Sequence, residues 1–286
     1  MLPRTSREIL AGVLLARVWV IAFFVLTYVV TALLWLPAVR SGQPLAVVMQ
    51  GREALPIVIA TVVPSLVAIV LSGIESRWQG IRELLAQAVR WRFGVGWYAV
   101  AIFLAPLVWA VSLAIGRILG AGVPQVQLDV LIPLAAIGEE LGWRGYALPR
   151  LQGRMRPLTA SLLIGILWAG WHLPYYAFPD AHPLPFALDF GLFSATIISE
   201  SVLATWIYNS TGGSVLATML YHHSIHVASI IPVLPGVVGA VILAFVNVAA
   251  ALGAVFVSRG LLVGVQRGPR VFSFRAVAGD AQGGQS

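Results

Sequence analysis

The fold is decided by a stretch near the start of the chain, VWVIAFFVLTYVVTALLWL at residues 18–36. It holds no charged residue and has about the ~20 residues that an α-helix needs to cross a hydrocarbon core of ~30 Å. It is longer than the ~7–15-residue apolar region of a cleaved signal peptide. The sequence therefore predicts a transmembrane helix that stays in the chain as an anchor.

The rest of the chain has the same apolar character. Of its 286 residues, 59% are hydrophobic and 10% are charged, whereas a soluble domain carries roughly 25% charged residues. A soluble protein needs a wetted surface, so lipid must replace water over most of this one. The absence of cysteine excludes disulfides, thiolate metal sites and cysteine nucleophiles. No basic stretch is interleaved with exposed aromatic residues on a soluble face, so we expect the net charge of +7 to mark topology and expect no nucleic-acid partner.

Apolar runs of similar length recur and predict about eight spans. One of them is weak, because Glu139, Glu140 and Arg144 follow its apolar part. The predicted spans are residues 14–36, 55–73, 96–119, 128–149, 158–178, 187–208, 213–233 and 235–257. We therefore expect an all-α, polytopic transmembrane helical bundle.

Arginines indicate how the bundle is oriented. Four groups of arginines fall on one side of the membrane only if residues 128–149 cross it, and the positive-inside rule makes that side, with both termini, cytoplasmic. The groups are Arg4 and Arg7; Arg77, Arg82, Arg90 and Arg92; Arg150, Arg154 and Arg156; and Arg259, Arg267, Arg270 and Arg275. The amphipathic residues 75–93 favour an interfacial helix on the cytoplasmic face or a connector helix packed on the bundle.

Charged residues at membrane depth indicate function, because an ionised side chain at the bilayer centre costs at least ~2.5–3.5 kcal/mol. Glu140 and Arg144 lie four residues apart, so they share one face of a helix and can neutralise one another. Glu139 lies on another face and has no partner within its own segment. This leftover carboxylate suits a general base or acid. The alternative is that both glutamates face a water cavity or bind a basic residue from another span.

Four of the five histidines also fall at membrane depth. His172 follows the tryptophan-rich Trp168–Trp171 stretch; alone, such a histidine is more often part of the core than catalytic. His222 and His226 share a helix face, and His223 points elsewhere. Glu200, in the middle of its predicted span, is a candidate partner for Arg144 or for a histidine, and His182, in a proline-rich loop, is expected to be uninvolved.

A cluster of glutamate and histidine on three helices admits two chemistries. Glu139, His172 and His222 could ligate Zn²⁺ with an open coordination position, and His222 and His226 have the spacing of two ligands on one helix. Alternatively, Glu139 and one histidine could activate a water directly while a second histidine donates a hydrogen bond to the oxyanion. Both would hydrolyse a peptide bond, and the spacing does not separate them.

These residues resemble the CPBP family, the CAAX-protease and bacteriocin-processing group of intramembrane proteases that is also called the Abi family. Its pattern is E-E-x-x-x-R, then an aromatic followed by x-x-x-H, then H-x-x-x-N, each on its own helix. Glu139, Glu140 and Arg144 match the first motif. Trp168 and His172 match the second, with tryptophan where phenylalanine is usual. His222 matches the third, at the family's distance from Gly213-Ser214, but His226 stands where asparagine is expected.

The resemblance implies a role for each matched residue. Glu139 would be the catalytic glutamate, and His172 would help it to hold the attacking water. His222, with His226 in the asparagine's role, would stabilise the oxyanion. Glu140, Arg144 and Trp168 would be structural or orienting. These enzymes were long described as metalloproteases, although the understanding of the family favours a glutamate-activated water.

His226 leaves the cofactor question open. Neutral histidine can still donate one N–H, so stabilisation of the oxyanion could survive the replacement. The same residue adds a possible zinc ligand to Glu139, His172 and His222. We therefore expect no certain cofactor, with zinc as the candidate.

The resemblance divides the chain into three parts. Residues 1–127 would hold the N-terminal transmembrane helices and the interfacial helix, 128–228 the catalytic core, and 229–286 the last transmembrane helix and a disordered tail. The expected activity is that of a multi-pass endopeptidase of a prokaryotic plasma membrane, acting on peptide or membrane-anchored protein substrates within the lipid bilayer. The alternatives are a non-catalytic immunity or scaffold protein and a proton-coupled transporter.

Overall fold

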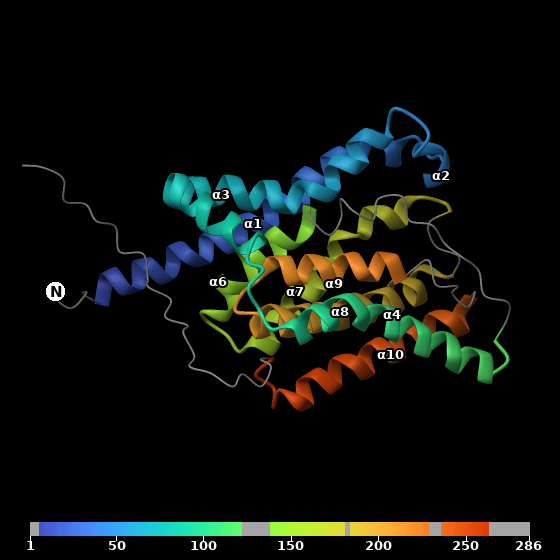
Figure 1. Cartoon of the computed structure of the whole chain (residues 1–286). Coiled ribbons are helices and arrows are strands. Elements are labelled where there is room, and N and C mark those ends of the chain that lie inside the picture. Colours follow the sequence, from blue (N-terminus) through green and yellow to red (C-terminus); the bar gives the residue numbers. More distant parts are fainter. Residues whose placement is uncertain (1–5, 122–137, 181–183, 229–235, 263–286) are drawn as a thin grey trace, which may run out of the picture.

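The computed structural model describes residues 6–121, 138–180, 184–228 and 236–262, with side chains from Val18 onward, as a bundle of helices (Figure 1). No strand occurs among these residues, which confirms the all-α fold class. The described helices are α1 (Ser6–Arg40), α2 (Leu45–Val48), α3 (Ala54–Ala88), α4 (Val95–Ile118), the π-helix η1 (Leu141–Ala147), α6 (Leu148–Gln152), α7 (Pro157–Trp171), the 3-10 helix η2 (Leu173–Ala177), α8 (Phe186–Ser210), α9 (Val215–Ala228) and α10 (Gly236–Val257).

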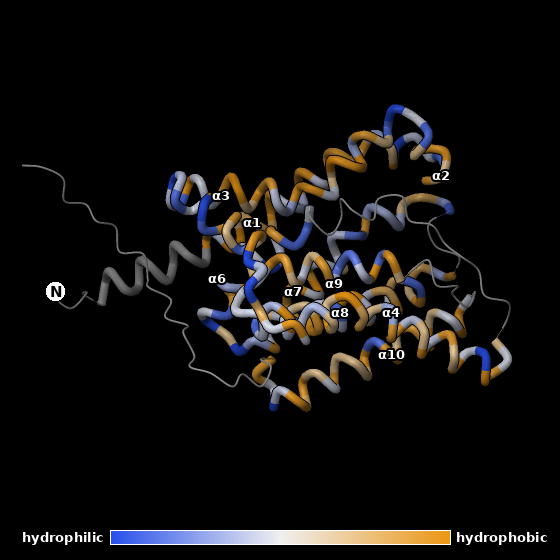
Figure 2. The backbone as a smooth tube through the Cα atoms, in the orientation of Figure 1, coloured by the Kyte–Doolittle hydropathy of each residue, from blue (hydrophilic) through white to orange (hydrophobic). Residues whose placement is uncertain are grey.

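Five of these helices are long and apolar enough to cross a membrane: α1 from Val18, α3, α4, α8 and α10. Figure 2 shows hydrophobic residues along these helices, which make the chain a multi-pass membrane protein. α7 and α9 coincide with two further predicted spans but have only 15 and 14 residues. Residues 128–137 of the predicted span 128–149, together with His182 and the tail, lie outside the described residues. The number of eight spans and the cytoplasmic termini stay predictions.

α8 lies at the centre of the bundle and packs against α7, α10, α9 and α4. Small side chains allow close approach: a Cβ added to Gly165 of α7 would lie 2.8 Å from the Cα of Ile198 in α8. Ser201 Oγ of α8 also donates to the Ser161 carbonyl of α7 at 2.9 Å. Because lipid offers no hydrophobic drive between helices, such packing and interhelical hydrogen bonds hold α7 and α8 together.

α3 consists of two helical parts that fold back on each other. The chain reverses at Ser76 and Arg77, and Arg77 has the unusual φ of 52° and ψ of −144°. Gly80 makes the reversal possible, because a Cβ there would lie 2.4 Å from the Ser72 carbonyl oxygen. The second part, residues 78–88, falls within the predicted amphipathic segment 75–93; its position at the membrane interface stays a prediction.

The first part of α3 supports the segment that carries the glutamates. The Cβ of an alanine at Gly138 would lie 2.6 Å from the Thr61 carbonyl oxygen, and one at Gly142 would lie 2.6 Å from the Pro64 carbonyl oxygen. Both contacts are with backbone atoms, which cannot rotate out of the way. The glycines therefore let η1 and the residues before it lie directly on the backbone of α3.

We expect Gly142→Ala to destabilise the protein by about 1–3 kcal/mol, because the added methyl overpacks η1 against α3. The matched control is Gly253→Ala in α10, where a Cβ would meet nothing within 4 Å. Thermal unfolding of the purified variants in detergent measures the difference. Equal melting temperatures for the two variants would contradict the close contact of η1 with α3.

Candidate active site

The three motifs converge from three parts of the chain. Glu139 and Glu140 are α-helical and lead directly into the π-helix η1, whose seven residues are all buried. Trp168 lies in the last turn of α7, with His172 capping that helix. His222 and His226 lie in α9. A π-helix is rare and occurs mostly at functional sites, because it displaces side chains from their regular helical positions.

Glu139 is held by two indole N–H groups. Its Oε2 accepts a hydrogen bond from Trp168 Nε1 at 2.6 Å and another from Trp143 Nε1 at 3.3 Å. The expectation that Glu139 lacks a partner within its own segment is therefore wrong, because Trp143 lies four residues further along the same helical segment. Both donors are neutral, so the carboxylate is oriented without being paired to a cation. No described residue donates to its Oε1.

The predicted pair of Glu140 and Arg144 is confirmed. Arg144 Nη1 lies 2.8 Å from Glu140 Oε1, and neither residue has any exposed surface. His222 Nδ1 contacts the same oxygen at 3.0 Å. Glu140 therefore joins η1 to α9, a function that helical spacing alone did not reveal.

Trp168 lies at the centre of this cluster. While its N–H binds Glu139, its ring faces the Arg144 guanidinium at 4.6 Å and the His222 ring at 5.2 Å, centre to centre. A phenylalanine would offer a ring of similar position but no N–H donor. Trp168 thus connects the two glutamates: its N–H binds Glu139, and its ring contacts Arg144, which is paired with Glu140.

His172 adjoins the cluster through Trp168. Its Nδ1 lies 2.8 Å from the Trp168 carbonyl oxygen, and a carbonyl can only accept, so Nδ1 carries the proton. In the neutral ring, Nε2 then has a lone pair. The rings of Trp171 and Phe193 pack edge-on against it at 5.0 and 5.1 Å. His172 is therefore positioned to accept a hydrogen bond through Nε2.

The two histidines of α9 stack on each other, with ring centres 5.0 Å apart and an angle of 17° between the planes. His222 is buried and His226 is partly buried. Because His222 donates Nδ1–H to a carboxylate, its Nε2 has a lone pair in the neutral ring and becomes a donor once the ring is protonated. The half-buried His223 has no contact that joins it to this cluster among the described residues.

Aromatic side chains of α1 cover the glutamate segment. Phe23 lies edge-on to Trp143 with ring centres 5.5 Å apart, and Phe24 stacks on it at 6.0 Å. Trp171 donates to Thr31 Oγ1 at 2.9 Å, which ties α7 to α1 as well. These rings exclude water from one side of Glu139 and so strengthen every electrostatic interaction of the cluster.

The suggested zinc ligands do not converge. Glu139, His172, His222 and His226 are all described, yet the described residues hold no group of three His, Asp or Glu side chains close enough to share a metal ion. Oε2 of Glu139 is directed to two indoles, and Nδ1 of His222 to Glu140. The arrangement therefore does not fit the zinc site that the spacing suggested.

Glu200 is a second buried acid near Arg144. It lies in α8 with 4% of its surface exposed, and the Arg144 charge acts on it without an ion pair between the two side chains. Within the described part of the chain, Arg144 Nε and Nη2 and Glu140 Oε2 are buried and have no hydrogen-bond partner. No direct bond joins Glu200 to Arg144, and its suggested role as a partner of Arg144 or of a histidine stays a prediction.

Two comparisons with known proteins bear on this site. Residues 124–228 match the family model described as type II CAAX prenyl endopeptidase Rce1-like. The chain is also 27% identical over 228 residues to CAAX prenyl protease 2 of Methanococcus maripaludis, an alignment that covers 71% of this chain and 81% of that protein. The family match contains every residue that the three motifs contribute to the cluster. Together with the multi-pass helical fold and the three motifs, both matches support the CPBP family and the activity of a membrane peptide hydrolase.

Proposed function

We propose that the chain is an intramembrane endopeptidase in which Glu139 activates the attacking water. The observation that carries this proposal is the environment of Glu139: a buried carboxylate, oriented at Oε2 by two indole N–H groups and in contact with no cation. A structural carboxylate at membrane depth would be expected to have a cationic partner, as Glu140 has in Arg144. Oε1 retains the lone pairs that a general base needs.

The reaction follows from these positions. Glu139 Oε1 takes a proton from water, and the water oxygen attacks the carbonyl carbon of the scissile peptide bond. The remaining O–H of that water donates a hydrogen bond to His172 Nε2, which holds the attacking oxygen in place. When the tetrahedral intermediate collapses, Glu139 returns its proton to the leaving nitrogen and the C–N bond breaks.

Oxyanion stabilisation falls to α9 in this proposal. His222 can donate through Nε2 once its ring is protonated, and Glu140 at 3.0 Å is the counter-ion that such an imidazolium requires. The stacked His226 supplies a second donor in the position where the family pattern has asparagine. Glu140 and Arg144 act on the substrate only through His222 and Trp168, which makes them positioning residues.

The substrate class follows from the location of the site. A catalytic cluster inside a membrane bundle favours peptides or proteins that are anchored in or associated with the bilayer. The relative from Methanococcus maripaludis is named a CAAX prenyl protease. We propose a prokaryotic plasma membrane as the location, and peptide maturation or self-immunity as the role.

We expect Glu139→Gln to lower turnover by about 10²–10⁴-fold, because the amide cannot take the proton of the water. The fold should survive, since the amide oxygen can still accept from the two indoles. Cleavage of a membrane-anchored peptide library by reconstituted protein measures turnover, and thermal unfolding reports the fold. The control is Glu53→Gln, a partly exposed carboxyl outside the site. Wild-type turnover by Glu139→Gln would rule out the proposed base.

His226 should act as a donor that an amide can replace. We expect His226→Asn to keep turnover within about threefold, since the asparagine amide also has N–H groups. His226→Leu has no donor and should lose about 10²–10³-fold in kcat, the usual effect of removing one oxyanion donor. His223→Leu on the same helix is the matched control. Equal activity of the asparagine and leucine variants would exclude this role.

Removal of metal should leave the enzyme active, because the donor atoms do not converge on a common ligand position. Turnover is measured before and after treatment with a zinc chelator, with zinc content determined on the same preparation. The expected result is unchanged turnover at substoichiometric zinc. Stoichiometric zinc, together with loss of activity that added zinc restores, would replace the glutamate–water mechanism by a metal one.

A further inference from the structure

The second part of α3 and the residues directly after it expose large apolar side chains beside a helix that is long and apolar enough to cross a membrane. Trp78 and Val89 are each 71% exposed, Trp91 is 59% exposed and Leu85 is 41% exposed. The first part of α3, residues 54–75, rises about 33 Å at ~1.5 Å per residue, which matches a hydrocarbon core of ~30 Å. We therefore expect the reversal at Ser76 and Arg77 to lie near a membrane surface, and residues 78–91 to begin at the level of the lipid headgroups.

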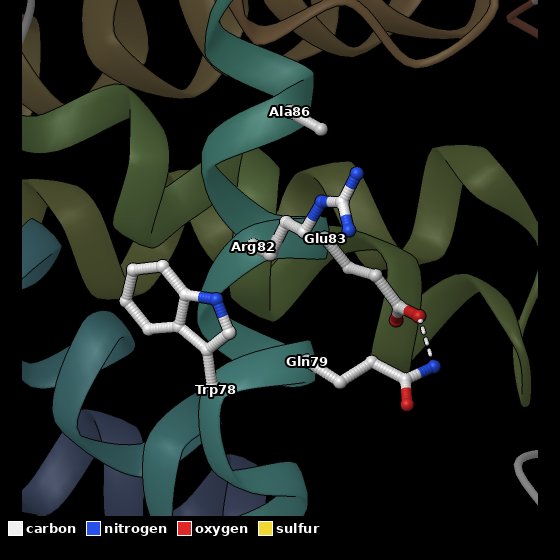
Figure 3. A pocket seen from close by; sticks show the side chains of 5 residues that line it. All are labelled: Trp78, Gln79, Arg82, Glu83 and Ala86. Atoms are coloured by element: carbon white, nitrogen blue, oxygen red, sulfur yellow. Dashed lines mark hydrogen bonds between the residues drawn. The ribbon is translucent and has the colours of Figure 1, made fainter.

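This surface also has an excess of positive charge. Within residues 77–92, Arg77, Arg82, Arg90 and Arg92 are exposed, and Glu83 is the one exposed carboxyl. Gln79 Nε2 binds Glu83 at 2.9 Å, and Figure 3 shows this pair on the helix beside the Arg82 guanidinium. Arg82 has no ion pair with any described residue. It lines a shallow surface cavity of about 390 Å³ together with Trp78, Gln79, Glu83 and Ala86.

We propose that this face, which we call the α3 platform (Trp78, Arg82, Leu85, Val89, Trp91 and Arg92), binds the headgroups of anionic phospholipids. Tryptophans settle at the headgroup level of a bilayer, and apolar side chains of an interfacial helix enter the acyl boundary. Arginines near such a surface attract anionic lipids by about 1 kcal/mol each. The combination of exposed tryptophan, unpaired arginine and an adjoining span favours a lipid over a soluble partner.

The opposite face of the same helix contacts the catalytic segment. Leu84 is 3% exposed, and a Cβ added to Gly145 of η1 would lie 3.1 Å from its Cδ1. Gln87 Nε2 donates to the Gly145 carbonyl at 3.2 Å, and Tyr208 of α8 donates to Gln87 Oε1 at 2.7 Å. Gly145 directly follows Arg144 in η1. Lipid bound to the platform would therefore stabilise the helix that packs against η1 and so the positions of Arg144 and Glu140. An effect of lipid on turnover rests on the proposed function.

The test compares the full chain in nanodiscs of phosphatidylcholine with increasing phosphatidylglycerol. Arg82→Gln/Arg92→Gln should weaken the apparent affinity for phosphatidylglycerol by about 10–30-fold, at ~1 kcal/mol per arginine. The control is Arg52→Gln/Arg117→Gln, an equal charge change. Figure 1 places α2, beside Arg52, and the end of α4 at the far end of the bundle from the second part of α3. Equal weakening by both double variants would overturn the proposal.

Two further arms separate the sources of the effect. Inorganic phosphate and glycerol phosphate, added to phosphatidylcholine nanodiscs, should not occupy the platform; competition by either at millimolar concentration would identify a free-anion site instead. Lipid affinity is also measured on Glu139→Gln, which should bind as the wild type does, so the result stands apart from proteolysis. Phosphatidylglycerol should raise wild-type turnover several-fold and leave the platform variant unchanged. Equal stimulation of both would overturn the coupling to η1.

Discussion

The ion pair of Glu140 with Arg144 is the interaction on which the site depends. Both side chains are completely buried in a membrane protein, where an unpaired charge costs several kcal/mol and water is not available to replace a lost partner. The pair is therefore obligatory once either residue is present. The pair also positions another residue. The Glu140 oxygen that binds Arg144 also binds His222, so the same carboxylate fixes the imidazole ring of His222 on α9.

The π-helix and its glycines make this pairing possible. Gly138 and Gly142 allow the segment to lie on the backbone of α3, and the widened turn directs Trp143 and Arg144 into the bundle. Trp168 then fills the space between the two glutamates, with its N–H on Glu139 and its ring on Arg144. Packing density and hydrogen bonding support each other here, because each ring that excludes water also makes the enclosed polar contacts stronger.

The two faces of the second part of α3 relate the site to its surroundings. One face supports η1 through Leu84 and Gln87, while the other exposes tryptophan and arginine. A helix with this division is suited to an interface, where apolar and charged groups both find partners. In the proposed enzyme, the second part of α3 and the π-helix η1 thus lie between the lipid headgroups and the water that Glu139 activates.

The sequence by itself determined the membrane class and the helical nature of the fold, and it named the residues that the structure brings together in one cluster. Charge-free runs leave a chain no alternative to helices in lipid, and charges inside such runs are costly enough to indicate function. The pairing of Glu140 with Arg144 was also predictable, since i,i+4 contacts are local. The Trp143 bond to Glu139 has the same spacing and could have been found by the same rule.

Only the tertiary structure decided which helices meet. The bonds of Trp168 to Glu139 and of His222 to Glu140 join residues 29 and 82 positions apart, which helical periodicity cannot relate. The zinc ligands suggested by spacing do not converge, because their donor atoms are directed to indoles and a carboxylate. A metal site or a hydrogen-bonded cluster uses the same residue types, and only their directions in space distinguish the two.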